Sequence, residues 1–237
     1  GSLQFLVASR GHHADIGGIT PGSMPATSCS LEQEGVIIQP IRIVRDGMLD
    51  EALVRGHLTS GPWPARNPDQ NMADLRAQLA ANTRGVEELR RLVLEFGLPT
   101  VQAYMKHVMD NGESCVRSLL PKIKPNSIEV PMDNGSLIRL QLRLEGGRMV
   151  FDFSGTSDQC DTNFNAPPAV SRAAVLYVLR CLIDDDIPLN EGCLRPVDII
   201  IPEGSLLNPN SPAAVVAGNV ETSQCVVDAI LGTVRAQ

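Results

Sequence analysis

The hydrophobic period of the chain changes from helical to strand-like across residues 121–125, a segment that begins and ends with proline. Before this segment, apolar residues recur every three, four or seven positions over residues 71–96, which is the stripe of an amphipathic helix. After it, residues 137–144 alternate apolar and polar side chains, and residues 148–153 do the same beyond a Gly146-Gly147 turn. The change predicts helices followed by a β-hairpin with one buried face.

The remaining pattern extends this prediction. Residues 99–120 form a second helical stripe just beyond Gly97, so we expect an antiparallel helical pair that covers the sheet. The other expected elements are strands at 3–9, 35–44 and 197–201, a buried helix at 171–183 and a helix from Thr222 or Ser223 to the end of the chain. Helices and strands do not alternate regularly, which predicts an α+β fold: a mixed sheet with a helical hairpin and further packed helices. An irregular α/β arrangement is the alternative.

Three segments follow from this order. Residues 1–65 hold a strand and a glycine-rich loop, residues 66–124 the helical hairpin, and residues 125–237 the β-hairpin, the buried helix and the last helix.

Composition excludes several classes of protein. The 20 Lys and Arg residues against 27 Asp and Glu residues give a net charge of −7 without a dense basic run, which argues against non-specific nucleic-acid binding. The apolar runs are too short to span a bilayer. The six cysteines lack a CxxC pair, so we expect six reduced thiols in a cytoplasmic protein.

The densest group of reactive side chains is the GHHAD sequence, with His12, His13 and Asp15. Imidazole and carboxylate at this spacing suit a divalent metal, and the flanking glycines allow close approach of the backbone. The same residues also suit a general base oriented by a carboxylate. The structural alternative is a loop in which the histidines bond to the carboxylate and to backbone carbonyls.

Two later segments are candidate substrate-binding loops. Asn163 and Asn165 are positioned to aim two amides at a substrate, or else to form turns before the buried helix. Asn219 and Glu221 lie before the last helix, where small polar residues form an anion-binding concavity or simply cap the helix. The chain contains neither GxxxxGK[ST] nor GxGxxG, so it lacks those two nucleotide-binding loops.

Several blocks of the sequence resemble the hydantoinase B family, which includes the C-terminal region of ATP-dependent 5-oxoprolinase. The blocks are ASRGHHADIGGITPGSMP at residues 8–25 and the sequences at residues 71–85, 151–182, 186–209 and 213–232. The oxoprolinase branch is the more similar one over residues 66–85. We expect the chain to be an internal piece of the B region that has little activity alone.

The resemblance also implies a chemistry and partners. A hydantoinase A subunit or domain binds ATP and phosphorylates a small cyclic amide, and the B part then opens the ring with water. Alternatives are a ketone carboxylase subunit and a non-catalytic scaffold for the A subunit. In relatives, a histidine of the GHHAD sequence and an upstream His-x-x-Asp hold a divalent metal. The resemblance therefore implies Mn, Zn or Mg bound at His12 or His13, together with Asp15. It also implies an oligomer, formed with the A part or with copies of the same chain.

Overall fold

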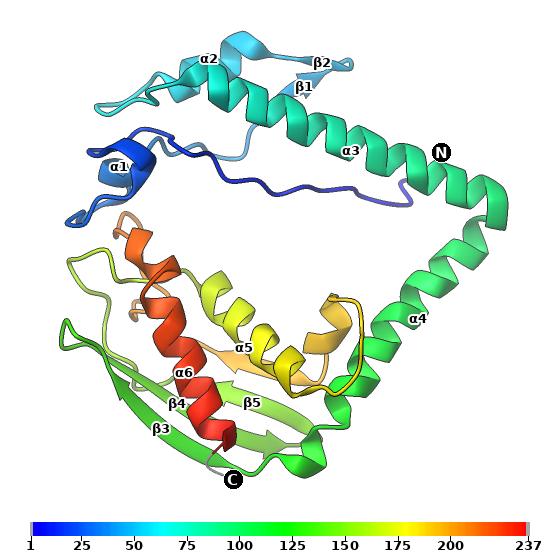
Figure 1. Ribbon diagram of the computed structural model, residues 1–237, viewed down its shortest axis with the longest axis vertical. Helices are drawn as coiled ribbons and strands as arrows, with labels where there is room; N and C mark the ends of the chain where they lie inside the picture. Colours follow the sequence, from blue (N-terminus) through cyan, green and yellow to red (C-terminus); the bar gives the residue numbers. More distant parts are fainter. Residues whose placement is uncertain (1, 236–237) are drawn as a thin grey trace. The chain divides into compact units, whose positions relative to one another are not determined.

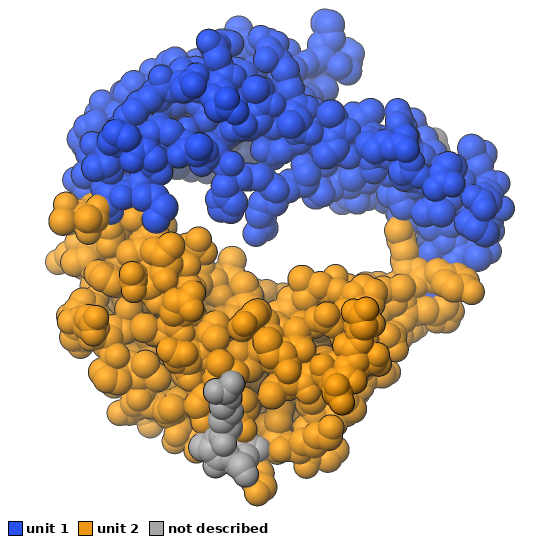
Figure 2. All heavy atoms as spheres, viewed as in Figure 1, with its two compact units in different colours: residues 1–25, 31–103 blue, residues 26–30, 104–237 orange. Residues whose placement is uncertain are grey.

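The computed structural model describes residues 2–235 and divides into two compact units. Unit 1 comprises residues 1–25 and 31–103, and unit 2 comprises residues 26–30 and 104–237 (Figure 2). Each unit has its own hydrophobic core.

Unit 1 is built around two helices and several short elements (Figure 1). Its elements are η1 (Pro21–Ser23), α1 (Leu31–Glu34), β1 (Val44–Arg45), β2 (Met48–Leu49), α2 (Glu51–Leu58), α3 (Pro68–Phe96) and the start of α4 (Leu98–Arg117). Its core is small, with Val54, Leu58, Ala65 and Met72 buried and with Ile16, Ile38, Ile43, Leu49 and Leu75 packed around them. The core therefore joins α2 and the beginning of α3 to the loop that carries Ile16.

The ends of α3 follow from single residues. Asn67 caps the helix, since its side-chain oxygen accepts a hydrogen bond from the Gln70 backbone at 3.2 Å, and Pro68 occupies the first turn. Gly97 ends the helix with a φ of 81°. Helix α3 therefore ends at the glycine that separates the two expected helical stripes.

The C-terminal half of the apolar stripe of α3 faces the N-terminal segment of the chain, residues 3–7, which runs along the helix (Figure 1). Side chains of this segment and of Val86, Leu89 and Val93 line one apolar groove. The predicted strand at residues 3–9 is wrong, because this apolar run packs on a helix and pairs with no strand within the described residues. Leu3 and Leu6 are mostly exposed.

A second predicted strand needs correction. Residues 35–44 do not form a strand, and only Val44–Arg45 at their end pairs with Met48–Leu49. The two expected helices are present as α3 and α4, and Gly97 separates them. Their packing as an antiparallel pair over the sheet stays a prediction, since α3 and most of α4 belong to different units.

Unit 2 contains a four-stranded sheet in the order β3-β4-β5-β6. The strands are β3 (Asn126–Pro131), β4 (Leu137–Glu145), β5 (Arg148–Asp152) and β6 (Val197–Ile200). The first three pair antiparallel and β6 pairs parallel with β5, so the sheet is mixed and the predicted α+β class is confirmed. The β4–β5 hairpin turns at Gly146 and Gly147, whose φ angles of 55° and 74° suit the tight turn of a two-residue loop.

Helices α5 (Pro168–Leu182) and α6 (Thr222–Arg235) pack against each other, and α6 packs on β3 and β4 (Figure 1). The other helical elements of the unit are η2 (Leu120–Lys122), η3 (Glu191–Leu194) and η4 (Val216–Asn219). The core contains the inward residues of the strands and the facing residues of both helices, among them Ile138, Leu140, Leu142, Met149, Phe151, Val175, Val178, Leu179, Val226 and Ile230. The predicted β-hairpin, the buried helix and the strand at residues 197–201 are confirmed. The last helix is confirmed up to Arg235, and its predicted continuation to the end of the chain lies outside the described residues.

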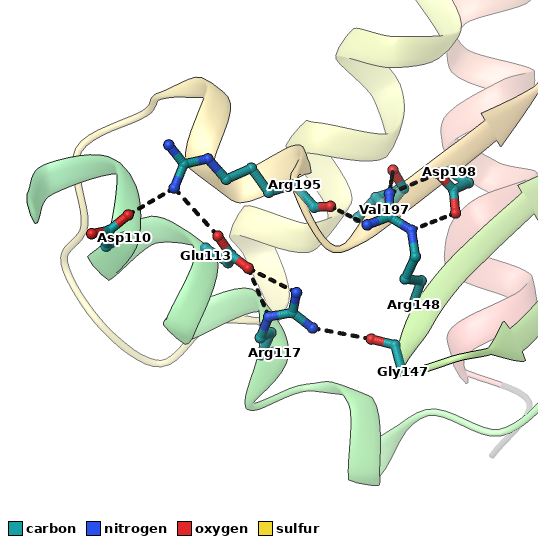
Figure 3. Close-up of polar contacts among 8 residues, drawn as sticks. All are labelled: Asp110, Glu113, Arg117, Gly147, Arg148, Arg195, Val197 and Asp198. Atoms are coloured by element: carbon teal, nitrogen blue, oxygen red, sulfur yellow. Dashed lines mark hydrogen bonds and ion pairs between the residues drawn. The ribbon is translucent and has the colours of Figure 1, made fainter. Parts of the chain in front are cut away.

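The C-terminal half of α4 is tied to unit 2 by a network of ion pairs (Figure 3). Arg195, just after η3, contacts Asp110 at 2.8 Å and Glu113 at 3.3 Å. Arg148 of β5 pairs with Asp198 of β6 at 2.6 Å and also donates to the Arg195 carbonyl. Exposed pairs of this kind contribute little individually, but together they join α4, η3 and the edge of the sheet.

Among residues 2–235, no helix is both long enough and apolar enough to cross a membrane. All six cysteines are free thiols, as their spacing predicted.

Candidate functional site

The GHHAD loop, residues 10–25, is positioned in unit 1 by backbone hydrogen bonds to two other segments. Gly18 donates to the Trp63 carbonyl at 3.0 Å, and Ile19 donates to the Gln33 carbonyl at 2.8 Å. Gly17 has a φ of 95°, and a Cβ there would lie 2.2 Å from the Trp63 oxygen. A glycine is therefore required where the loop passes the Trp63 backbone.

Asp15 braces this loop. Its carboxylate accepts hydrogen bonds from the backbone of Gly17 and of Gly22, both at 2.8 Å, and pairs with Arg66 at 2.8 Å. Burial alone would raise the pKa of Asp15, but these hydrogen bonds outweigh burial and hold the pKa below its usual value. Both carboxylate oxygens thus accept hydrogen bonds from protein donors, which favours a loop-bracing role for Asp15 over the predicted role of a metal ligand.

His13 is oriented by a different carboxylate. Its Nδ1 atom lies 2.8 Å from Asp74 Oδ2, and the side-chain amide of Gln70 donates to Asp74 Oδ1 at 2.9 Å. The hydrogen bond with His13, followed by that with Gln70, lowers the pKa of Asp74. Within the described residues Nε2 of His13 has no hydrogen-bond partner, so this nitrogen is open to a ligand or a proton.

The three residues predicted as metal ligands therefore do not converge. His12 is exposed, His13 faces Asp74 and Asp15 faces Arg66. Among residues 2–235, no group of three or more His, Cys, Asp and Glu side chains is arranged to hold a metal ion. His13 alone has the arrangement of a metal-ligating histidine, with one ring nitrogen held by a carboxylate and the other open.

The loop at residues 160–166 lies in unit 2, and its asparagines are buried. Asn165 accepts from the Cys160 backbone at 2.8 Å and donates to the carbonyls of Cys160, Thr162 and Ala214. Asn163 donates to the Ser28 hydroxyl at 3.2 Å. The bonds of Asn165 to Cys160 and Thr162 favour its turn-forming role over substrate binding, whereas Asn163 connects the loop to a distant segment of the chain.

The segment with Asn219 and Glu221 packs beside this loop. The Ala217 backbone donates to the Asn163 carbonyl at 3.0 Å, and a Cβ on Gly218 would lie 2.2 Å from the Asn165 oxygen. The side chains of Asn219 and Glu221 are exposed. The structure thus brings the two predicted substrate-binding loops together in unit 2, while the GHHAD loop belongs to unit 1.

Comparison with known sequences identifies the family. The sequence profile described as hydantoinase B/oxoprolinase matches residues 1–237, which is the whole chain. The chain belongs to the hydantoinase B/oxoprolinase family. This membership confirms the resemblance carried by the GHHAD sequence and the later blocks.

Relatives within the hydantoinase B/oxoprolinase family include named 5-oxoprolinases. The chain is 45% identical to 5-oxoprolinase 1 of Arabidopsis thaliana and 45% identical to 5-oxoprolinase of Saccharomyces cerevisiae, matching 100% and 98% of its own length. It is 26% identical, over 93% of its length, to a B-type component of a putative D-/L-hydantoinase from Pseudomonas. The chain spans about a fifth of the length of the two 5-oxoprolinases, 21% and 19%.

Two solved structures show that the fold is shared. The ATP-dependent caprolactamase of Pseudomonas jessenii superimposes with a TM-score of 0.79 at 24% identity, over 94% of this chain and 40% of that protein. The nucleotide-free structure of an acetone carboxylase gives a TM-score of 0.73 at 16% identity, over 88% of this chain and 30% of that one.

Sequence reasoning on this hydantoinase B/oxoprolinase chain missed Arg66, Gln70, Asn71 and Asp74. These residues come from the end of one loop and the first turns of α3, and Asn71 donates from its buried side chain to the Asp15 carbonyl at 2.8 Å. The i, i+4 spacing of Gln70 and Asp74 predicts that the two side chains lie on one face of a helix. Nothing in the sequence predicts that Asp74 contacts His13, which lies 61 residues away.

Proposed function

We propose that this chain is part of an ATP-dependent cyclic amidohydrolase that opens the ring of 5-oxoproline. The observation that carries the proposal is the 45% identity, over essentially the whole chain, to 5-oxoprolinases of a plant and a yeast, against 26% to the hydantoinase component from Pseudomonas. This difference favours the oxoproline lactam over the hydantoin ring as substrate.

The proposed chemistry divides between two parts. A lactam carbonyl is a poor electrophile because of amide resonance. The hydantoinase A part therefore transfers the γ-phosphoryl group of ATP to the carbonyl oxygen, which creates a leaving group. Water then adds to the carbonyl carbon and the C–N bond breaks, which leaves an acyl phosphate. A second water hydrolyses this acyl phosphate to the carboxylate and free phosphate. The lack of GxxxxGK[ST] and GxGxxG loops in this chain fits ATP binding by the A part.

The GHHAD loop is the proposed site of ring opening. His13 is its best-prepared group, since Nε2 is open and Nδ1 is held by Asp74. The open nitrogen suits the removal of a proton from the attacking water or the binding of a divalent cation. Asp15 has the supporting role of holding the loop through Arg66 and the Gly17 and Gly22 backbones.

A divalent metal, Mn, Zn or Mg, belongs to this proposal with His13 and the exposed His12 as its ligands from this chain. When bound, the ion supplies positive charge that activates water or polarises an oxygen. Because Asp15 is committed to other donors, further ligands have to come from parts of the protein outside this chain. Asn219 and Glu221 remain proposed substrate-binding residues on the exposed loop of unit 2.

We also propose a cytoplasmic complex. Its members are this B part, a hydantoinase A subunit or domain, and a small cyclic amide as substrate, with the B part also able to associate with its own copies.

The test is turnover by the complete enzyme, the full polypeptide together with its A part. We expect ADP, phosphate and glutamate to form with 5-oxo-L-proline, and little turnover with hydantoin or with acetone plus bicarbonate. Turnover of acetone and bicarbonate would assign a ketone carboxylase instead.

A second measurement separates an enzyme from a scaffold. The His12→Ala/His13→Ala double variant should lose ring opening, whereas His107→Ala, which changes an exposed histidine of α4, should not. Full turnover by the double variant would mean that this chain serves as a scaffold for the A part.

A further inference from the structure

The side chains of Gln70, Asp74 and His13 form a directed chain of hydrogen bonds. Gln70 and Asp74 lie one turn apart on α3, and the Gln70 amide nitrogen donates to Asp74 Oδ1 at 2.9 Å. The second oxygen, Oδ2, lies 2.8 Å from His13 Nδ1. Each carboxylate oxygen of Asp74 thus has its own partner.

This arrangement decides the tautomer of His13. An ionised carboxylate only accepts hydrogen bonds, so a neutral imidazole at 2.8 Å from Oδ2 must carry its proton on Nδ1. The lone pair is then on Nε2, the nitrogen that has no partner within the described residues. In a neutral imidazole, the hydrogen bond made by one ring nitrogen thus decides whether the other nitrogen is protonated.

The surroundings hold this geometry. The side chain of His13 is 13% exposed and that of Asp74 is 26% exposed, so protein covers most of both partners. Next to it, Asn71 on the same helix is buried and donates to the Asp15 carbonyl at 2.8 Å, which fixes the backbone two residues beyond His13. The loop and the helix are therefore joined at two neighbouring points.

We propose that Asp74, oriented by Gln70, is a positioning residue that holds His13 as the Nδ1–H tautomer and presents the Nε2 lone pair. The functional part of this inference rests on the proposed function, whether Nε2 accepts a proton or binds a cation. The tautomer itself does not rest on it. The sequence pairs His13 with Asp15, but the structure gives this role to Asp74 and leaves Asp15 to Arg66.

The direct test is the nitrogen-15 NMR spectrum of the full chain labelled at histidine, recorded at a pH where imidazole is neutral. The chain has 4 histidines, so the His13 signals can be assigned by their loss in His13→Gln. In the unchanged chain we expect a protonated Nδ1 and an unprotonated Nε2 for His13. A dominant Nε2–H form in the unchanged chain would overturn the proposal.

Asp74→Asn provides the matched change. If Gln70 continues to donate to the side-chain oxygen of the introduced asparagine, the NH2 group of this asparagine faces His13 Nδ1. Because an amide NH2 group only donates, Nδ1 has to accept, and the imidazole proton moves to Nε2. We expect the Nδ1–H form to lose its dominance in Asp74→Asn and in Asp74→Ala. Glu51→Gln, which changes a carboxylate of α2 that pairs with Arg76, should leave the His13 signals unchanged. A circular dichroism spectrum like that of the unchanged chain shows that each variant is folded.

Activity of the complete enzyme gives a second, separable result. We expect Asp74→Asn to lower kcat about 10- to 100-fold, the usual loss when the partner of a functional histidine is removed. A tautomer change without any loss of activity would overturn the positioning role. Absence of 5-oxoproline turnover in the unchanged enzyme would instead contradict the proposed function, and the NMR result would still decide the role of Asp74 toward His13.

Discussion

At the scale of single residues, Asp15 and Asp74 show how two carboxylates of one unit acquire different tasks. Asp15 accepts from two backbone groups and from Arg66, which closes the GHHAD loop on itself. Asp74 accepts from one side chain of its own helix and faces an imidazole. The first arrangement stabilises a loop, and the second prepares a reactive nitrogen.

The bracing role of Asp15 predicts a pH-dependent loss of stability in Asp15→Asn. At neutral pH we expect the free energy of unfolding to fall by about 1–3 kcal/mol, the cost of leaving buried donors without their charged acceptor. Because the pKa of Asp15 is lowered in the folded chain, its contribution is complete above the ordinary carboxyl pKa of about 3.9 and is lost as pH falls through the lower folded value. Urea unfolding of both chains from pH 7 to pH 3 measures this difference.

The control for this prediction is Glu32→Gln, which alters an exposed carboxylate of the same unit. We expect its effect to stay within about 0.5 kcal/mol at every pH. A difference between Asp15→Asn and the unchanged chain that grows toward low pH would have the wrong sign and would contradict the role of Asp15.

At the scale of elements, the long helix α3 contains a glycine in its interior. Gly85 lowers helix propensity, yet a Cβ at this position would lie 2.7 Å from Val7 Cγ1. The N-terminal segment therefore packs on α3 at a point where only glycine leaves room. The presence of glycine at position 85 is thus explained by the packing of the N-terminal segment and not by a requirement of the helix.

This packing predicts that Gly85→Ala depends on residue 7. In a Val7→Ala chain the added methyl group finds space, and we expect a gain in the free energy of unfolding of about 0.5–1 kcal/mol. In the chain with Val7 the same substitution should bring no gain, because the methyl group displaces the valine. Chemical denaturation of the four chains of this double-mutant cycle measures the coupling. Equal effects of Gly85→Ala in both backgrounds would show that Val7 does not pack on Gly85.

The sheet of unit 2 gives a second prediction at this scale. Leu140 points into the core and is fully buried, while its neighbour Gln141 points to the opposite, exposed face. We expect Leu140→Ala to lower the free energy of unfolding by about 2–5 kcal/mol and Gln141→Ala to change it by less than about 0.5 kcal/mol. Comparable losses in the two variants, measured by thermal or urea unfolding, would mean that the strand has the other register.

At the scale of the whole molecule, unit 2 was more predictable from sequence than unit 1. The alternation in β4 and β5 and the Gly146-Gly147 turn are local signals, and each specifies which face is buried. Residues 3–9 contain a similar density of apolar side chains, but nothing in their sequence distinguishes packing on a helix from pairing with a strand.

The candidate site was also only partly predictable from the sequence. The GHHAD loop could be predicted because its histidines, aspartate and glycines are close together in sequence, and Gly17 is required where the loop passes the Trp63 backbone. Asp74 could not be predicted, because it meets His13 only once α3 lies against the loop. Asp15, two residues after His13, is the carboxylate nearest to it in sequence. In the folded chain Asp15 pairs with Arg66 instead, so it does not orient His13.

The last prediction concerns metal binding by the whole chain. Within residues 2–235, no three side chains of the ligating types converge, and Asp15 is held by Arg66 and two backbone donors. One or two imidazoles leave most positions on an ion to water, so we expect this chain alone to bind Mn²⁺ or Zn²⁺ weakly. A polypeptide of the full length of the 5-oxoprolinase relatives, about five times that of this chain, should bind more than 100-fold more tightly, since losing a direct ligand costs more than the ~10- to 100-fold typical of its supporting partners. Calorimetric titration of both polypeptides measures the ratio, with His13→Gln as the control that removes binding from each. Tight binding by this chain alone, abolished by Asp15→Asn, would mean that Asp15 leaves Arg66 to become a ligand.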